Sequence, residues 1–88
     1  MDRDKIFGGV DPVRLRNATF AVIDKTQDEP EHQLQAIGLA LVCACEGTGI
    51  DVREVLTACE RMRTVQSGPF VTTYDAIVRY AKDTMGRF

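Results

Sequence analysis

Three cysteines and one histidine are the thiol and imidazole side chains with which this chain could bind a metal ion. Cys43 and Cys45 are two residues apart in a predicted helix, so their side chains point about 200° apart and do not share one ion. Cys59 and His32 would complete a set of four ligands, but the C-x-x-C spacing of zinc sites is missing. We therefore predict no metal site and no cofactor, and interpret all three cysteines as buried apolar side chains.

A nucleophile with its base is the second chemistry that these residue types allow. His32 and Cys43 are about 16 Å apart along one helix, which is too far for proton transfer. A dyad of His32 with Cys59 would depend on the tertiary fold. The chain also contains no glycine-rich phosphate loop, no H-E-x-x-H and no G-x-S-x-G. We therefore predict no catalytic residues and no enzyme activity.

The stretch CEGTGIDVREVLTACERM, residues 45–62, has the outline of a DNA-reading helix-turn-helix. Cys45 stands at its small position, Gly49 at its turn glycine and Val55 at an apolar position of its second helix. A plain helical hairpin contains the same glycine turn and the same helix cap, so the spacing alone does not separate the two. We favour the structural junction and keep a DNA-binding transcription regulator, over residues 41–62, as the alternative function.

Charge argues against DNA as the partner of this segment. The exposed face of its second helix would carry three carboxylates and two arginines, and the net charge of the chain is −2. Nucleic-acid binders draw much of their affinity from neutralising phosphates, so they usually show a basic face. The residues of that face are Asp51, Arg53, Glu54, Thr57, Glu60 and Arg61. The candidate contacts for a protein partner or for DNA are Arg53, Thr57, Arg61 and Phe70.

Four helices are needed to position these residues. Asp11, Asp51 and Thr72 each follow an apolar residue and precede another one four positions into a helix, which is typical of an N-cap with a hydrophobic staple. Asp28 and Glu31 have the spacing of a capping box for the remaining helix. We predict the helices at about 12–26, 29–46, 52–63 and 73–85.

The fold class predicted from these elements is all-α, a compact bundle of four helices with the second helix central. Residues 19–23, TFAVI, would also suit a strand, but no second strand is predicted to pair with them. Eighty-eight residues are enough for one hydrophobic core. We therefore expect a single domain over residues 1–88, in which residues 1–10 could form a flexible arm.

The second helix is apolar on every side from Ala36 onward. Ala36, Ala40 and Ala44 recur every four residues and leave a smooth surface, beside which Leu41 adds bulk. A helix that is apolar all round needs neighbours all round. Either the other three helices surround it, or a second copy of the chain packs on it as a homodimer, and both interpretations stay open. The candidate self-association residues are Ala36, Ala40, Ala44 and Leu41.

The run HQLQAIGLALVCACEGTGIDVREVLTACERM, followed by GPF and VRYAKD, resembles small helical accessory proteins of tailed phages and prophages. The resemblance covers about residues 32–82 and implies a protein that binds and redirects a host or phage protein. It assigns no site residue. We therefore expect a small non-enzymatic interaction protein, a phage-type regulator or inhibitor with a protein partner.

The start of the chain is charged and does not resemble a signal peptide. The longest apolar run, residues 36–45, is too short to span a bilayer. Three cysteines, an odd number, indicate reduced thiols. We expect a cytoplasmic protein that does not interact with membranes.

Overall fold

The computed structural model describes residues 9–65 and 67–86 of the chain. These residues form four helices, and they contain no strand, so the all-α fold class with four helices is confirmed. Residues 19–23 are helical. Most of the arm predicted over residues 1–10 lies outside the described residues. The helices are α2 (Pro12–Lys25), α3 (Pro30–Thr48), α4 (Val52–Thr64) and α5 (Pro69–Met85).

Two of the predicted helix caps are confirmed. The Asp11 carboxylate accepts hydrogen bonds from the backbone N–H groups of Val13, at 2.8 Å, and Arg14, at 3.2 Å. The Asp51 carboxylate accepts one from the backbone N–H of Arg53 at 2.9 Å. These bonds satisfy amides that have no partner inside their own helix, and they fix where α2 and α4 begin.

The start of α5 was predicted wrongly. The helix begins at Pro69, so Thr72 lies within its first turn and is not the cap. Gly68 precedes the helix with φ 99° and offers no side-chain cap. Proline suits the first helical position because its φ is already helical and it has no N–H to satisfy. Gly68 and Pro69 therefore start the helix earlier than the capping pattern at Thr72 predicts.

The capping box predicted for α3 is also wrong. The helix follows Glu29, whose side chain makes no capping hydrogen bond, and Pro30 occupies the first turn. The Asp28 carboxylate instead accepts from the backbone N–H of Glu29 at 2.7 Å, before the helix begins. The local bond of an aspartate to a neighbouring amide competes here with capping.

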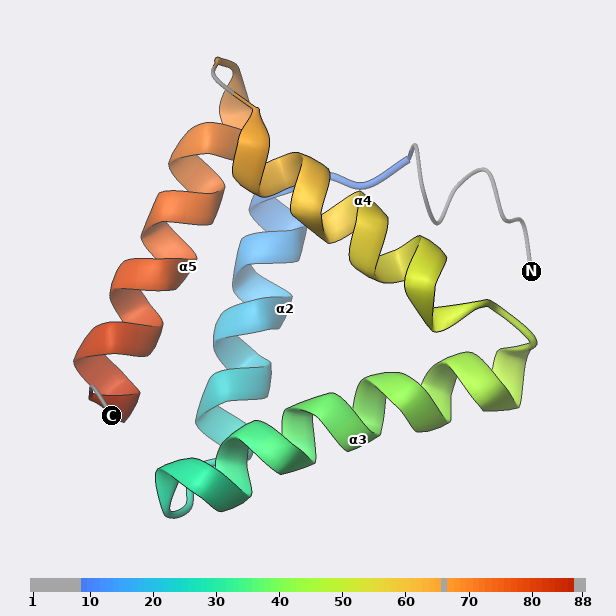
Figure 1. The fold of residues 1–88 in the computed structure, drawn as a ribbon. Helices are drawn as coiled ribbons and strands as arrows, with labels where there is room; N and C mark the ends of the chain where they lie inside the picture. Colours follow the sequence, from blue (N-terminus) through green and yellow to red (C-terminus); the bar gives the residue numbers. More distant parts are fainter. Residues whose placement is uncertain (1–8, 66, 87–88) are drawn as a thin grey trace.

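α2 and α5 lie side by side and form the best-packed part of the molecule (Figure 1). Ile23 of α2 is 5% exposed, and Thr73 of α5 is also buried. The rings of Phe20 and Tyr80 stack with their centroids 4.3 Å apart. The Tyr80 hydroxyl donates a hydrogen bond to the Asp24 carboxylate, and this bond raises the pKa of Tyr80. α2 and α5 are thus held together by buried apolar contacts and by one exposed hydrogen bond.

α3 and α4 diverge from a turn at Gly49 and close an open frame with the α2–α5 pair (Figure 1). α3 contacts α2 and α4. Gly49 adopts φ 75°, a left-handed conformation that favours glycine, and it ends α3. The backbone N–H of Ile50 then bonds to the Cys45 carbonyl at 3.0 Å. The molecule measures 35 × 33 × 19 Å, so the frame is flat.

The central position expected for the second helix is corrected by the burial of α3. Among the described residues only four are buried, and α3 supplies two of them, Gln33 and Cys45. Leu34, Leu39 and Val42 of the same helix are 50%, 63% and 47% exposed. α2 and α5 pack mainly on each other, and α3 runs along one side of the frame rather than through its centre.

Candidate functional site

α3 carries a long segment without charged side chains. Its 19 residues extend over about 28 Å, and residues 33–45 contain no charged side chain. Leucine and alanine, which favour helix strongly, make up much of this segment. None of the described helices is both long and apolar enough to cross a lipid bilayer.

Gln33 fixes how α3 is rotated about its axis. Its side chain is 3% exposed, and its amide donates hydrogen bonds to the Ile23 carbonyl at 2.8 Å and to the Thr26 hydroxyl at 3.3 Å. The Ile23 carbonyl lies in the last turn of α2, where carbonyl oxygens lack helical partners. The buried Gln33 amide satisfies this carbonyl oxygen. It thereby holds the side of α3 on which Gln33 lies against the C-terminal end of α2.

One row of side chains follows Gln33 along the inner side of α3. Ile37 and Leu41 are half-buried, and Cys45 is 6% exposed. Residues four positions apart lie above one another on a helix, so Gln33 orients the whole row. The structure thus places Leu41, a predicted self-association residue, on the inner side. Sequence reasoning missed Gln33, although its four-residue spacing from Ile37 was a visible signal.

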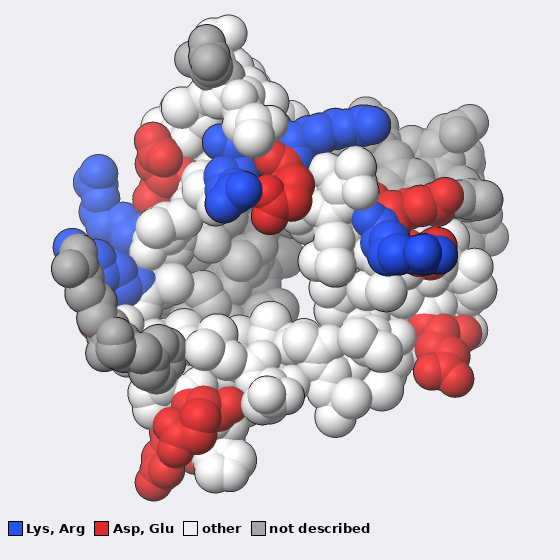
Figure 2. Space-filling model, in the orientation of Figure 1, with Lys and Arg blue, Asp and Glu red and all other residues white. Residues whose placement is uncertain are grey.

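The opposite side of α3 is exposed along its full length. We call this surface the outer face; Leu39, at 63%, and Val42, at 47%, are its large apolar side chains. In Figure 2 the visible part of α3 is uncharged and acidic groups lie near both of its ends. A contiguous exposed apolar surface is a candidate site of interaction. The outer face consists of His32, Gln35, Ala36, Leu39, Val42, Cys43 and Glu46, all exposed.

The predicted row of Ala36, Ala40 and Ala44 is exposed throughout. Each step of four residues advances about 40° around a helix, so the row turns from the outer face toward the inner side. α3 also contains Gly38 and Gly47, and a Cβ at either would meet no other atom within 4 Å. Close packing within the described part of the chain therefore does not require glycine at positions 38 and 47, and the three alanines lie at the surface.

The arginines of α4 are largely paired with neighbouring acids. Arg53 forms an ion pair with Asp51 at 3.0 Å, and this hydrogen bond and charge raise the pKa of Arg53. Arg63 pairs with Glu60 at 2.7 Å. Arg61 is exposed. Carboxylates beside the guanidinium groups reduce the positive potential that a phosphate backbone would meet.

The remaining candidate contacts are placed on two different helices. Thr57 is exposed on α4, and its hydroxyl donates to the Arg53 carbonyl at 2.8 Å, a bond within the helix. Phe70 is half-buried in the first turn of α5. Arg53, Thr57 and Arg61 are spaced four residues apart and so share one side of α4, whereas Phe70 belongs to another element.

The interpretation of the three cysteines as buried side chains holds only for Cys45. Cys43 and Cys59 are exposed, and all three thiols are free. The expectation was wrong for Cys43 because no other helix covers the side of α3 on which it lies. Cys59 as a residue is exposed, but partial burial of its thiol, together with the charge of Glu60, raises its pKa.

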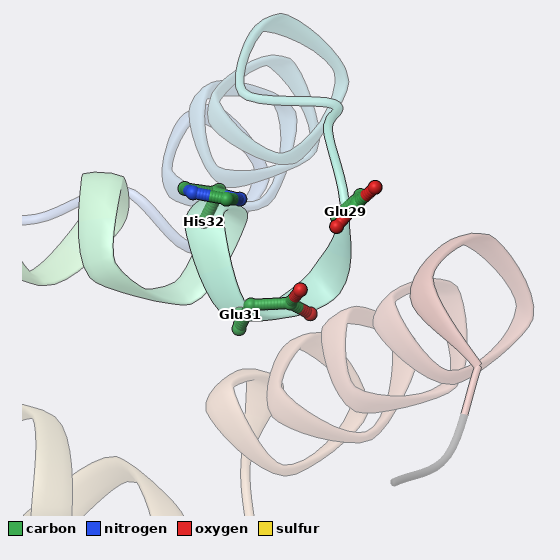
Figure 3. Close-up of side chains that lie close together, drawn as sticks. All are labelled: Glu29, Glu31 and His32. Carbon is green, nitrogen blue, oxygen red and sulfur yellow. The ribbon is translucent and has the colours of Figure 1, made fainter.

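Glu29, Glu31 and His32 form a cluster at the start of α3 (Figure 3). One possible metal-binding atom of each lies within 4.8 Å of the others, and all three residues are exposed. Sequence reasoning considered His32 only with cysteines and missed its acidic neighbours. The partial positive charge of a helix N-terminus stabilises nearby carboxylates and disfavours a cation. That effect alone explains why Glu29 and Glu31 lie at the start of α3.

No family model, no curated protein and no solved structure matches this chain. Its function must therefore be inferred from the surfaces that the described residues form.

Proposed function

We propose that this protein is a small non-enzymatic interaction protein that binds another protein chain through the outer face of α3. The observation that carries the proposal is the exposure of Leu39 and Val42 within a segment free of charge. Covering such side chains removes apolar surface from water, which is the main favourable term in protein association.

The frame holds α3 in place at both ends, which supports the same proposal. The Gln33 amide fixes its start on α2, and the Gly49 turn fixes its end against α4. A partner therefore meets a helix whose rotation is already set and does not have to order it, which lowers the entropic cost of binding.

The partner that this surface suits is itself an apolar helix or a groove that accepts one. By occupying that surface the protein would regulate or inhibit its partner, and the resemblance over residues 32–82 supports a phage-type role with a host or phage protein. Free thiols, two of them exposed, suit a reducing compartment, so we place this interaction in the cytoplasm.

DNA binding remains the alternative, but no observation favours it. The turn at Gly49 between α3 and α4 is common to helix-turn-helix domains and to plain hairpins. Arg53 and Arg63 are paired with acids on the helix that would read the DNA. Duplex binding that weakens steeply with salt and is lost in Arg61→Glu would favour the alternative.

A photo-crosslinking amino acid at position 39 tests the proposed function in living cells. We expect a discrete protein adduct from this position, because the side chain lies in the middle of the outer face. The matched control is position 78, since Val78 of α5 is 50% exposed but belongs to another surface. If both positions give the same adducts, or neither gives one, the outer face is not a binding surface.

A further inference from the structure

The formal charges around the outer face are all of one sign. Residues 26–50, which include α3 and both of its flanks, contain carboxylates and no lysine or arginine. Glu29 and Glu31 each have a carboxylate oxygen within 4.8 Å of a His32 nitrogen at the start of the face. Glu46 is exposed at its end, and Figure 2 shows acidic groups near both ends of an uncharged stretch. The outer face is thus an apolar surface with negative charge at each end.

Glu46 lies where the fold itself favours a positive charge. The C-terminus of a helix has a partial negative charge, so a lysine or arginine in the last turn stabilises the helix. α2, α4 and α5 each have such a residue in the last turn, whereas α3 has none there and carries Glu46 instead. No ion pair of the described residues includes Glu46. The helix dipole therefore explains Glu29 and Glu31 but not Glu46, whose charge a cation from another molecule would balance.

The length of the outer face sets the spacing of the cations that would match it. His32 and Glu46 are 14 residues apart, which corresponds to about 21 Å along a helix. A helix laid along α3 would need lysine or arginine about 14 residues apart, with apolar side chains between them on the same side. Its apolar middle would cover Leu39 and Val42. Ala36 is small and exposed, so the partner helix can approach α3 closely there.

The same charges disfavour the other occupants of this face. A second α3 brings no lysine or arginine, so two copies packed through it would place the carboxylates of one near those of the other. Nucleic acids and anionic lipid headgroups are negatively charged, as are both ends of the outer face, and would be repelled. An apolar helix without cations would cover Leu39 but leave the charge of Glu46 unbalanced.

We propose that the outer face of α3 binds a basic amphipathic helix of another protein, with an apolar middle over Leu39 and a lysine or arginine at each end. This inference rests on the proposed function, since it states the chemistry of the partner on the same surface. The apolar contact provides most of the affinity. The charges at the two ends select this partner over uncharged and acidic helices.

Isothermal titration calorimetry with synthetic helical peptides tests the chemistry of the partner directly. The probe peptide has leucines along one side of its middle and a pair of lysines at each end of that side. We expect a Kd of about 10–100 µM, since one pair of helices buries less than a standard interface. A peptide with glutamate in place of every lysine should bind at least about tenfold more weakly. So should a peptide of the same composition whose leucines are spread around the helix. Equal binding of either control peptide would overturn the proposal.

Variants of this chain locate the surface that the basic peptide uses. Glu46→Lys should weaken binding about three- to tenfold, whereas Asp83→Lys, the same charge change at an exposed position of α5, should leave it within about twofold. Leu39→Gln should weaken binding at least about tenfold and, because Leu39 is exposed, should keep the helical circular dichroism. Val78→Gln is its matched control. Equal effects at the matched positions would show that the peptide binds elsewhere or through net charge alone, and would overturn the proposal.

Stability and binding should change in opposite directions at position 46. Without peptide, Glu46→Lys should unfold about 1–5 °C higher than the wild type, because it restores a favourable charge at the C-terminus of α3. The same variant should bind the basic peptide more weakly. Glu46→Gln should lie between the wild type and Glu46→Lys in both measurements. If Glu46→Lys lost stability as well as binding, Glu46 would support the fold rather than a partner, and the proposal would be wrong.

The two proposals fail in different ways. We expect the protein segment cross-linked at position 39 in cells to carry lysine or arginine on both sides of an apolar stretch. If that segment is acidic or uncharged and the basic peptide does not bind at about 500 µM, the basic helix is wrong and the proposed function stands. If no adduct is specific to position 39 either, both are wrong. A wild type that dimerises through Leu39, or that binds vesicles containing phosphatidylglycerol more tightly than the peptide, would overturn the inference in favour of those occupants.

Discussion

The α2–α5 pair and α3 use apolar residues in opposite ways. In the pair, Ile23 is buried and Phe20 stacks on Tyr80, so part of the apolar surface of each helix is covered by the other, although Val22 and Val78 stay exposed. α3 is more uniformly apolar, yet Leu39 is 63% exposed. Apolar content therefore does not determine burial in this protein. Burial depends on whether a neighbouring helix reaches the residue, and the length of α3 exceeds what α2 and α4 cover at its two ends.

The largest expected difference between the two regions is the effect of truncating a side chain. Ile23→Ala should cost about 2–4 kcal/mol, because it leaves a cavity in the best-packed part of the fold. Leu39→Ala should cost less than about 1 kcal/mol in dilute monomer, because the side chain is exposed there. Urea denaturation at low micromolar concentration measures both. Equal losses would contradict the contrast between the regions.

Thiol labelling should separate the cysteines in the native state. Cys43 should react fastest, and Cys59 more slowly, because its raised pKa leaves less thiolate at neutral pH. Buried Cys45 should react at least about tenfold more slowly than Cys43. Mass spectrometry after proteolysis gives the three rates. A Cys45 rate equal to that of Cys43 would contradict the burial of Cys45.

Gln33 links the two regions, so its replacement tests how they are joined. Gln33→Met keeps the length of the side chain and removes the donor to the Ile23 carbonyl, which should cost about 1–3 kcal/mol. Gln35→Met is the matched control, since Gln35 is exposed on the same helix. Thermal unfolding compares the two variants. A loss in the control as large as in Gln33→Met would show that the buried amide does not hold α3 in place.

The smallest expected effect concerns the polar link of the α2–α5 pair. The hydrogen bond to Asp24 raises the pKa of Tyr80, so Asp24→Asn should lower that pKa toward its ordinary value. A tyrosine whose folded pKa is raised stabilises the fold below its unfolded pKa of about 10, and this contribution is lost as pH rises through the folded value. Ultraviolet titration of wild type and variant measures the shift. An unchanged titration curve would show that the bond is absent in solution.

The sequence predicted the local elements of this fold well where one residue decides them. Asp11 and Asp51 cap their helices, and Gly49 ends α3, because each acts through its own backbone or through amides two or three residues away. The prediction failed at Thr72, where Gly68 and Pro69 start the helix earlier. Two local signals competed there, and pattern alone does not rank them.

The candidate site was predicted only in part. The sequence indicated that the second helix is apolar on every side from Ala36 onward and needs neighbours all round, either the other three helices or a second copy of the chain. It did not indicate which side the chain itself would cover, so Leu41 was grouped with the alanines although it is half-buried on the inner side. Leu39 and Val42, the large exposed residues, were missed for the same reason.

The sequence by itself determined four helices, the Asp11 and Asp51 caps and the absence of charge over residues 33–45, because these properties depend on residues within a few positions of one another. Only the tertiary structure decided the exposed side of α3. The Gln33 amide reaches the carbonyl of Ile23, ten residues earlier in the chain, and this contact sets the rotation of the helix. In a helix that is apolar on every side, the spacing of apolar residues does not indicate which side faces the rest of the protein. A contact with another helix is needed to decide which side is buried and which is exposed.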